Sequence, residues 1–153
     1  MNYEEFKERL IKSQEAVVLF KEYFEKHGYE VEMPDLVIAP HAVGAFSKYA
    51  DQGDLFITKD NERLIVEVKH SGVDFDLTNW PYQSMIVNSF TGYNSKKHKP
   101  NVHIILSKDR THFVSIRDTT FEHWQLKRTY DRYKKDNLLF YFIDTKFVKF
   151  FKL

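Results

Sequence analysis

Residues 53 to 70 read GDLFITKDNERLIVEVKH, and this stretch carries the clearest indication of the fold and of a functional site. Two apolar runs flank the polar tetrapeptide at residues 59–62, a pattern typical of a β-hairpin with a tight turn. Because strand side chains alternate between two faces, Leu64, Val66 and Val68 share one face of the second strand. Glu67 and Lys69 then lie side by side on the other face, inside an otherwise apolar run. Burial of unpaired charge costs several kcal/mol, so these two residues call for an explanation beyond folding.

A second carboxylate belongs to the same hairpin. If the strands pair through the turn at residues 59–62, Asp54 lies across from Glu67, and two carboxylates and the Lys69 ammonium converge on one spot. Paired oxygen ligands suit Mg²⁺ or Mn²⁺. A neighbouring lysine can position a water molecule or offset the charge of a phosphate. Asp51 is a rival to Asp54 as the second acid, but Asp54 directly adjoins the strand that starts at Leu55.

Composition narrows the class of protein. The 153 residues carry 23 basic and 22 acidic side chains, 42% hydrophobic residues and no cysteine, which is consistent with a single domain over residues 1–153. The missing thiols exclude disulfides, thiolate zinc sites and cysteine nucleophiles. No apolar run is long enough to span a membrane, no secretory signal is visible, and no glycine-rich phosphate loop is present. We therefore expect a cytoplasmic, soluble protein.

The rest of the chain predicts an α/β or α+β fold around a mixed sheet. Apolar residues at helical spacing predict a helix over residues 2–27, and Gly28 is suited to end it in a left-handed conformation. We further expect strands over 29–38, 102–107 and 112–116, and loops over 39–52 and 92–100. The sequence also favours a helix over 81–90, a polar helix or two short ones over 118–137, and a C-terminal strand pair with a turn near Asp144.

The order helix, three strands, helix, strand, with Asp54 followed after twelve residues by Glu67-Val68-Lys69, resembles the PD-(D/E)XK nuclease superfamily. Glu15 on the first helix and Gln83 on the helix expected after the hairpin match two further positions. The resemblance covers residues 10–107 and departs at residue 53, a glycine where the family usually has proline. The literal Pro34-Asp35 pair lies too far upstream of Glu67 to share its hairpin.

The resemblance implies a restriction-endonuclease-like αβββαβ core, with a mixed central sheet, flanking helices and a C-terminal β extension. It also implies Mg²⁺- or Mn²⁺-dependent hydrolysis of DNA by an endonuclease of the restriction or Holliday-junction-resolvase kind, acting as a homodimer. Asp54, Glu67 and the Val68 carbonyl would bind metal, and Glu15 would hold a second metal or its water. Lys69 would orient the attacking water, and Gln83 would support Lys69 or the phosphate.

DNA contacts would have to come from local basic patches, because the net charge is only +1. Two segments offer them, and their candidate residues are Lys96, Lys97 and Lys99 in the first and Lys127, Arg128, Arg132, Lys134 and Lys135 in the second. Two other readings remain open. One is a module that binds nucleic acid or a protein partner without cutting, and the other is an assembly protein that uses the Phe-rich C-terminal end.

Overall fold

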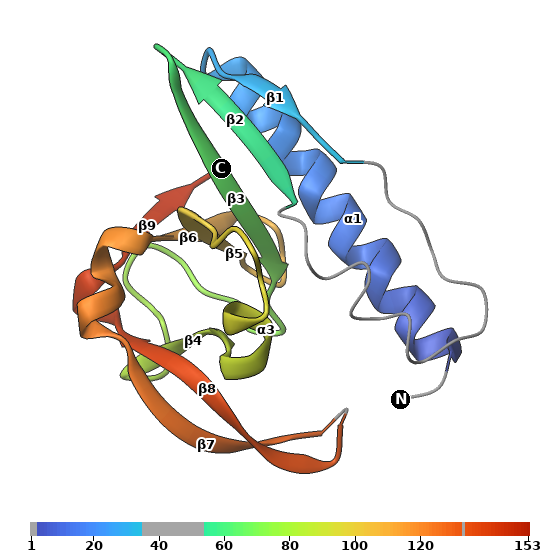
Figure 1. The fold of residues 1–153 in the computed structure, drawn as a ribbon, viewed down its shortest axis with the longest axis vertical. Helices are drawn as coiled ribbons and strands as arrows, with labels where there is room; N and C mark the ends of the chain where they lie inside the picture. The colour runs from blue at the N-terminus through green and yellow to red at the C-terminus, as the bar shows by residue number, and fades with distance from the viewer. Residues whose placement is uncertain (1–2, 35–53, 133) are drawn as a thin grey trace.

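The computed structural model describes residues 3–34, 54–132 and 134–153, which form a mixed α/β structure (Figure 1). Its elements in chain order are α1 (Tyr3–Lys26), β1 (Glu30–Glu32), β2 (Leu55–Lys59), β3 (Glu62–His70), β4 (Ser84–Ser89), α3 (Phe90–Asn94), β5 (Val102–Leu106), β6 (His112–Arg117), the 3₁₀ helix η2 (Asp118–His123), β7 (Gln125–Asp131), β8 (Asp136–Asp144), the 3₁₀ helix η3 (Thr145–Phe147) and β9 (Lys149–Lys152). The predictions for Asp51, Gly53 and the loop at 39–52 fall outside the described residues, as do residues 35–38 of the strand expected over 29–38. In the described part of that expected strand, only Glu30–Glu32 form a strand.

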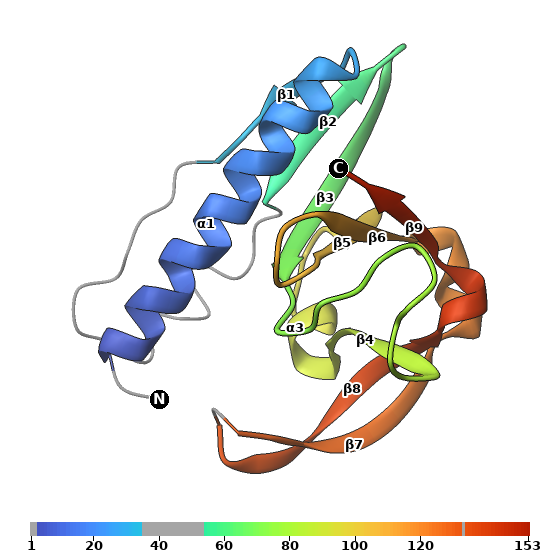
Figure 2. The ribbon, with the colours of Figure 1, turned by 180° about the vertical axis from the view of Figure 1, so that it is seen from behind.

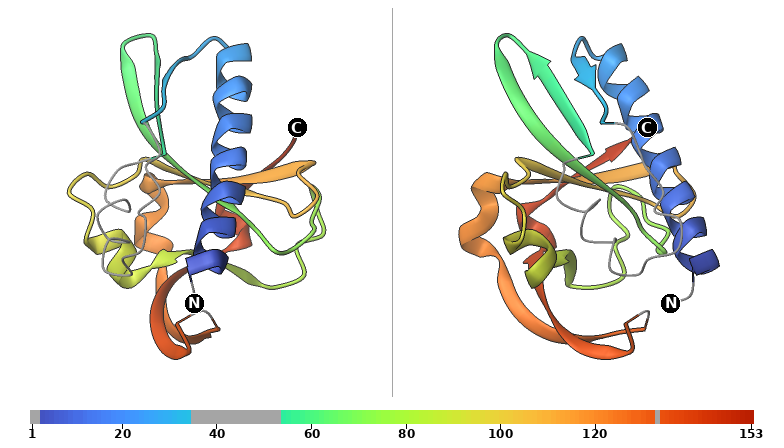
Figure 3. Two further views of the ribbon diagram at one scale, coloured as in Figure 1. Left: turned by 90° about the vertical axis from the view of Figure 1, so that its right-hand side faces the viewer. Right: turned by 45° about the vertical axis from the view of Figure 1, so that its right-hand side comes forward.

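A six-stranded mixed sheet forms the middle of the molecule, with the strand order β1-β2-β3-β5-β6-β9. Strands β3 and β5 run parallel, whereas the other neighbours in this sheet are antiparallel. Helix α1 covers one face of the sheet. A second, antiparallel sheet with the order β4-β8-β7 lies on the other side (Figures 2 and 3). The described residues are thus arranged in three layers.

The first core lies between α1 and the large sheet. Ala16, Val17 and Phe20 form the buried stripe of the helix, and they pack against Val66 and Val68 together with apolar residues of β2, β5 and β6. Gly28 ends the helix with φ of +86°, a left-handed conformation that glycine adopts without steric cost. The helix predicted over residues 2–27 is therefore confirmed.

The second core lies between the two sheets. Ile105, Val114 and Ile116 of the large sheet face Met85 and Ile143 of the small one, and all five side chains are buried. In β5, Ile104 belongs to the first core and Ile105 to the second, as strand alternation requires. Side chains on this second face of β3 therefore point into the space between the sheets, away from α1.

The hairpin predicted at residues 53–70 is confirmed in its described part. Leu55 pairs with Val66 and Lys59 with Glu62, and the two turn residues Asp60 and Asn61 both have positive φ, at 52° and 66°. Two consecutive left-handed residues define the type I′ turn, whose twist matches that of the flanking strands. The register of β2 and β3 is therefore fixed by both the turn and the buried face.

The helix predicted over residues 81–90 is wrong. Residues 84–89 form strand β4, and only the five residues of α3 are helical. Met85 and Val87 are buried whereas Ile86 between them is 40% exposed, which is the two-residue period of a strand rather than the period of a helix. Ser89 caps α3 by accepting a hydrogen bond from the Gly92 amide at 3.0 Å. The crossover between the parallel strands β3 and β5 is thus a strand followed by a short helix.

The helix predicted over residues 118–137 is also wrong, because this segment forms η2 and strand β7. Strand β7 pairs with β8 along its whole length, from Gln125 opposite Phe142 to Asp131 opposite Asp136. The strongly strand-forming run LLFYFI in β8 supplies the hydrogen-bond partner. The two C-terminal strands were correctly expected, but β8 and β9 join different sheets instead of pairing, because η3 carries the chain from one to the other.

These differences change the architecture in a specific way. A mixed sheet and a C-terminal β extension are present, but α1 is the one long helix among the described residues, and the second flanking layer is a sheet. No helix in the described part of the chain is long and apolar enough to cross a membrane.

Candidate active site

Glu67 is the centre of a cluster of polar side chains between the two sheets. It lies on the second face of β3, and its side chain is only 15% exposed. Its Oε2 atom accepts a hydrogen bond from the Asn88 amide of β4 at 2.9 Å and another from His103 Nε2 of β5 at 3.1 Å. His103 reaches it because the parallel pairing of β3 with β5 places the two residues directly opposite each other.

The other carboxylate oxygen of Glu67 faces two lysines. Lys96 Nζ lies 3.7 Å from Oε1 with a side chain only 5% exposed, and Lys69 Nζ lies 4.0 Å from the same atom. Burial by itself would raise the pKa of Glu67. The charge of Lys69, the hydrogen bond from His103 and the charge of Lys96 outweigh burial and hold the pKa well below its usual range. Glu67 is therefore ionised at neutral pH.

His103 is neutral in this environment. Burial lowers its pKa and outweighs the opposite effect of Glu67. The neutral ring donates from Nε2 to Glu67, and its Nδ1 atom is buried without a hydrogen-bond partner. An unprotonated Nδ1 atom without a hydrogen-bond partner costs less free energy than the unpartnered Nδ1–H group of a charged imidazolium would. The surroundings of Nδ1 therefore also favour the neutral ring with its proton on Nε2. His103 thus acts as a fixed donor that orients Glu67.

Asp54 completes the cluster from β2. It lies one residue before the Leu55–Val66 pair and so opposite Glu67, and its Oδ2 atom accepts a hydrogen bond from the Val68 amide at 2.7 Å. Burial and, next to it, the charge of Glu67 raise the pKa of Asp54 to about 6, despite the opposing charges of Lys69 and Lys96. Asp54 is a carboxylate whose negative charge is incompletely compensated.

We call these six residues the Glu67 cluster: Asp54, Glu67, Lys69, Asn88, Lys96 and His103. Sequence reasoning found the three hairpin members and missed Asn88 and His103. It also placed Lys96 in a polar loop as a candidate DNA contact, whereas the side chain is buried against Glu67. A signal for His103 was available, since it interrupts the otherwise apolar strand VHIIL much as Glu67 interrupts its own strand.

Glu15 lies apart from this cluster. It projects from α1, on the side of the large sheet opposite the Glu67 side chain, and is half exposed. Its carboxylate forms an ion pair at 2.6 Å with Arg110 in the turn between β5 and β6. The pair links the helix to that turn. Glu15 had been assigned to the site from the resemblance, which implies a carboxylate on the first helix.

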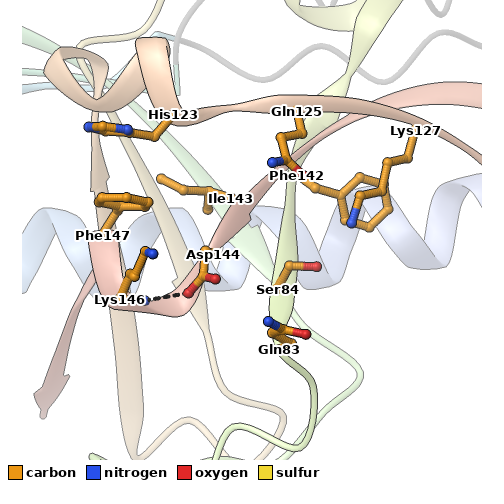
Figure 4. A pocket seen from close by; sticks show the side chains of 10 residues that line it. All are labelled: Gln83, Ser84, His123, Gln125, Lys127, Phe142, Ile143, Asp144, Lys146 and Phe147. Carbon is orange, nitrogen blue, oxygen red and sulfur yellow. Dashed lines mark hydrogen bonds between the residues drawn. The ribbon is translucent and has the colours of Figure 1, made fainter.

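Gln83 is not on a helix, and it lies at the small sheet rather than among the cluster residues. Its backbone carbonyl accepts a hydrogen bond from the Thr145 amide at 3.3 Å. It lines a pocket of about 240 Å³ beside Ser84, Asp144 and Lys146 (Figure 4). The amide side chain that does reach the cluster is that of Asn88, five residues later on β4, and it donates to Glu67 rather than supporting Lys69.

The remaining basic candidates are exposed. Lys97 and Lys99 follow α3, and Lys99 donates hydrogen bonds to the carbonyl groups of Asn94 and Lys96 at the end of that helix. The second basic group lies on β7 and around the turn to β8, on an antiparallel ribbon rather than on a helix. Its members are Lys127, Arg128, Arg132, Lys134 and Lys135.

The carboxylate pair fits a divalent cation of the Mg²⁺ type. In the described part of the chain no three His, Asp or Glu side chains are grouped to hold a metal ion. Mg²⁺ in proteins is nevertheless commonly held by one or two carboxylates, with water and substrate phosphates as its other ligands. The raised pKa of Asp54 shows where positive charge would be stabilised. Asp54, Glu67 and the Val68 carbonyl are the groups that would hold such an ion.

Comparisons with models of protein families, with curated proteins and with solved structures gave no match to this chain.

Proposed function

We propose that the chain is a metal-dependent DNA endonuclease of the PD-(D/E)XK kind, with the Glu67 cluster as its active site. The observation that carries the proposal is the position of Asp54 and Glu67, both partly buried, opposite each other on one hairpin, with Lys69 on the same face. A folded protein gains no stability from two adjacent partly buried carboxylates, whereas phosphodiester hydrolysis needs a cation and an oriented water molecule at one place.

The order of the elements supports the same proposal. Helix α1 is followed by three antiparallel strands, and β5 then adds parallel to β3. This is the order that the superfamily resemblance implies for a restriction-endonuclease-like core, apart from the crossover helix, which is replaced here by β4 and α3.

Five of the six cluster residues have a part in the proposed reaction. Mg²⁺ or Mn²⁺, held by Asp54, Glu67 and the Val68 carbonyl, would neutralise charge on the scissile phosphate. Lys69, whose side chain is 37% exposed, would orient the attacking water and stabilise the charge that builds up on the phosphate. The hydrogen bonds of Asn88 and His103 keep the Glu67 carboxylate in one orientation.

A second candidate is a module that binds nucleic acid without cutting it. The observation that favours it is that both Glu67 oxygens already have partners within the protein, namely two lysines, an amide and an imidazole. A carboxylate so completely surrounded can serve as a structural centre without any metal. An activity assay separates the two candidates.

The assay uses linear, flapped, single-stranded and four-way DNA with Mg²⁺, Mn²⁺ or EDTA, and compares wild type with Glu67→Gln and Lys69→Met. We expect cleavage that requires metal and is lost in both variants, while Lys149→Met at an exposed position on β9 cleaves like wild type. Cleavage by both variants at the wild-type rate would contradict the assignment of the Glu67 cluster as the active site. Tight DNA binding without cleavage of any substrate would favour the binding module. If the enzyme works as a homodimer, we expect a cut in each of the two DNA strands and a molecular mass in solution twice that of the monomer.

A further inference from the structure

Strands β7 and β8, with turn residues Arg132, Lys134 and Lys135 between them, form a two-stranded antiparallel ribbon whose far end stands away from the two cores. We call residues 125–140 the β7–β8 ribbon. Figures 1 and 3 show it leaving the small sheet and curving toward the end of the molecule where α1 begins. Most of its side chains are exposed, including Leu126 at 48% and Tyr130 at 60%.

Charge is concentrated on this ribbon. Residues 125–140 contain five basic and two acidic side chains, a net charge of +3, whereas the whole chain carries +1, so the remainder carries −2. Strand alternation puts Lys127 on one face and Arg128 on the other, and Lys134 and Lys135 lie at the turn. Positive charge therefore surrounds the ribbon on both faces and at its tip.

An aromatic cluster anchors the root of the ribbon. Tyr141 of β8 packs against Tyr93 of α3 and Trp124, with ring centroids 5.4 and 5.5 Å apart. Trp124 in turn contacts the His103 ring at 5.7 Å, and His103 holds Glu67. The base of the ribbon is thus fixed to the same side chains that support the Glu67 cluster.

An open groove connects the ribbon with Lys69. It has a volume of about 690 Å³, and its walls include Arg9 of α1 on one side and Thr129 and Phe142 of the ribbon strands on the other, with Lys69 also part of the lining. Lys127 lies over the Phe142 ring, with Nζ 5.3 Å from the centroid, and lines the neighbouring pocket, which shares Phe142 with the groove. Residues of the ribbon strands and Lys69 therefore line the same groove.

We propose that the β7–β8 ribbon enters the major groove of duplex DNA and contacts the phosphates on both sides. One DNA strand would then lie in the protein groove that Lys69 lines. The major groove of B-DNA is about 12 Å wide and admits a two-stranded ribbon, whereas the major groove of duplex RNA is too narrow for side chains to read. The exposed faces and surrounding positive charge of the ribbon suit a groove lined by two phosphate backbones. The proposal rests on the proposed function for its role in catalysis, but binding itself can be measured without cleavage.

The test measures binding of a short fluorescent DNA duplex by anisotropy in EDTA, so that no cleavage occurs. The ribbon variant Lys127→Gln/Lys134→Gln/Lys135→Gln is compared with the control Lys26→Gln/Lys149→Gln/Lys152→Gln, which removes the same charge from exposed positions elsewhere. Each phosphate contact makes the slope of log K against log salt concentration more negative by about 0.9. Removing three such contacts should therefore reduce the magnitude of the slope by about 2 to 3 in the ribbon variant. It should also bind roughly tenfold or more weakly at low salt, while the control changes by less than about threefold.

Methylation of guanine N7 in the major groove should interfere with binding of wild type and leave the residual binding of the ribbon variant unaffected. Equal weakening of the two triple variants, equally tight binding of duplex RNA, or no interference by N7 methylation would overturn the proposal. Circular dichroism and thermal unfolding establish that both variants are folded. If binding depends on the ribbon but the protein cuts no substrate, the proposed function is contradicted and this inference stands. If the protein cuts DNA but binding does not depend on the ribbon, this inference is contradicted and the proposed function stands.

Discussion

The β2–β3 hairpin and the β7–β8 ribbon place their charged side chains in opposite environments. The β2–β3 hairpin lies in the large sheet, with one face against α1 and the acidic pair Asp54 and Glu67 partly buried on the other. The β7–β8 ribbon has mostly exposed side chains and carries its charges on the surface. Buried charges in the first hairpin must be held by partners at defined distances, which suits chemistry, whereas exposed charges in the second can adapt to the backbone of a long polyanion. The predictions below test this division of roles.

The largest expected effect is on the chemical step. Replacing Lys69 by Met removes the ammonium that lies 4.0 Å from Glu67 and faces the groove. We expect the single-turnover cleavage rate to fall by about 10²- to 10⁴-fold with DNA affinity and folding little changed, because the lysine acts on the reacting phosphate. Quenched-flow cleavage assays at saturating enzyme measure this rate. A Lys69→Met variant that cuts at the wild-type rate would contradict the assignment of the active site to the β2–β3 hairpin.

The next effect compares two glutamates on the same strand. Glu67→Ala removes the carboxylate that faces the buried Lys96 ammonium and should lower the free energy of unfolding by about 3 kcal/mol. Glu62→Ala, at the exposed end of β3, should change it by less than about 0.5 kcal/mol. Urea denaturation followed by circular dichroism measures both. Equal values for the two variants would show that the Glu67 cluster contributes nothing to folding.

A third prediction concerns Asp54, whose pKa is raised to about 6. A carboxyl group with a folded-state pKa above its unfolded value binds more protons in the folded state, so it destabilises the protein as pH rises from about 4 to about 6. Asp54→Asn should therefore increase the free energy of unfolding by about 2 kcal/mol at pH 7 without metal, and this gain should disappear as pH falls to 4. Thermal unfolding of the two proteins across this pH range provides the measurement. A gain that persists at pH 4 would contradict the assigned cause.

The smallest effect tests how the turn sets the register of the β2–β3 hairpin. Asn61 has φ of 66°, and glycine is the preferred residue at this place in a type I′ turn. Asn61→Gly should raise the stability by roughly 0.5 kcal/mol, and Asn61→Val should lower it, because a β-branched residue resists positive φ. Differential scanning calorimetry resolves both changes. Destabilisation by glycine would mean that the turn is not what fixes this register.

Much of the β2–β3 hairpin could be predicted from the sequence, because its information is local. One face alternates cleanly, the turn residues suit positive φ, and Glu67 and Lys69 stand out against apolar neighbours. The β7–β8 ribbon offers no such signal. With both faces largely exposed, β7 has no apolar alternation, and the polar run was mistaken for a helix although its strand partner in β8 was evident.

The partners of Glu67 depend on contacts that are distant in the sequence. His103 meets it through the parallel pairing of β3 with β5, and Asn88 through the packing of β4 against the large sheet. Lys96 lies in the polar run SKKHK, which locally indicates an exposed loop, and only the fold brings its side chain to the carboxylate. Such contacts follow from topology, which residue patterns alone do not specify.

The most direct test of the central claim is a titration of the protein with Mn²⁺, in which free ion is measured by electron paramagnetic resonance. Wild type is compared with Asp54→Asn and with the control Asp60→Asn at the exposed turn of the same hairpin. If Asp54 and Glu67 form a metal site, wild type and the control bind Mn²⁺ alike and Asp54→Asn binds it at least about tenfold more weakly. Equal binding by all three proteins, or binding by none, would contradict the assignment of the Glu67 cluster as a metal-dependent active site.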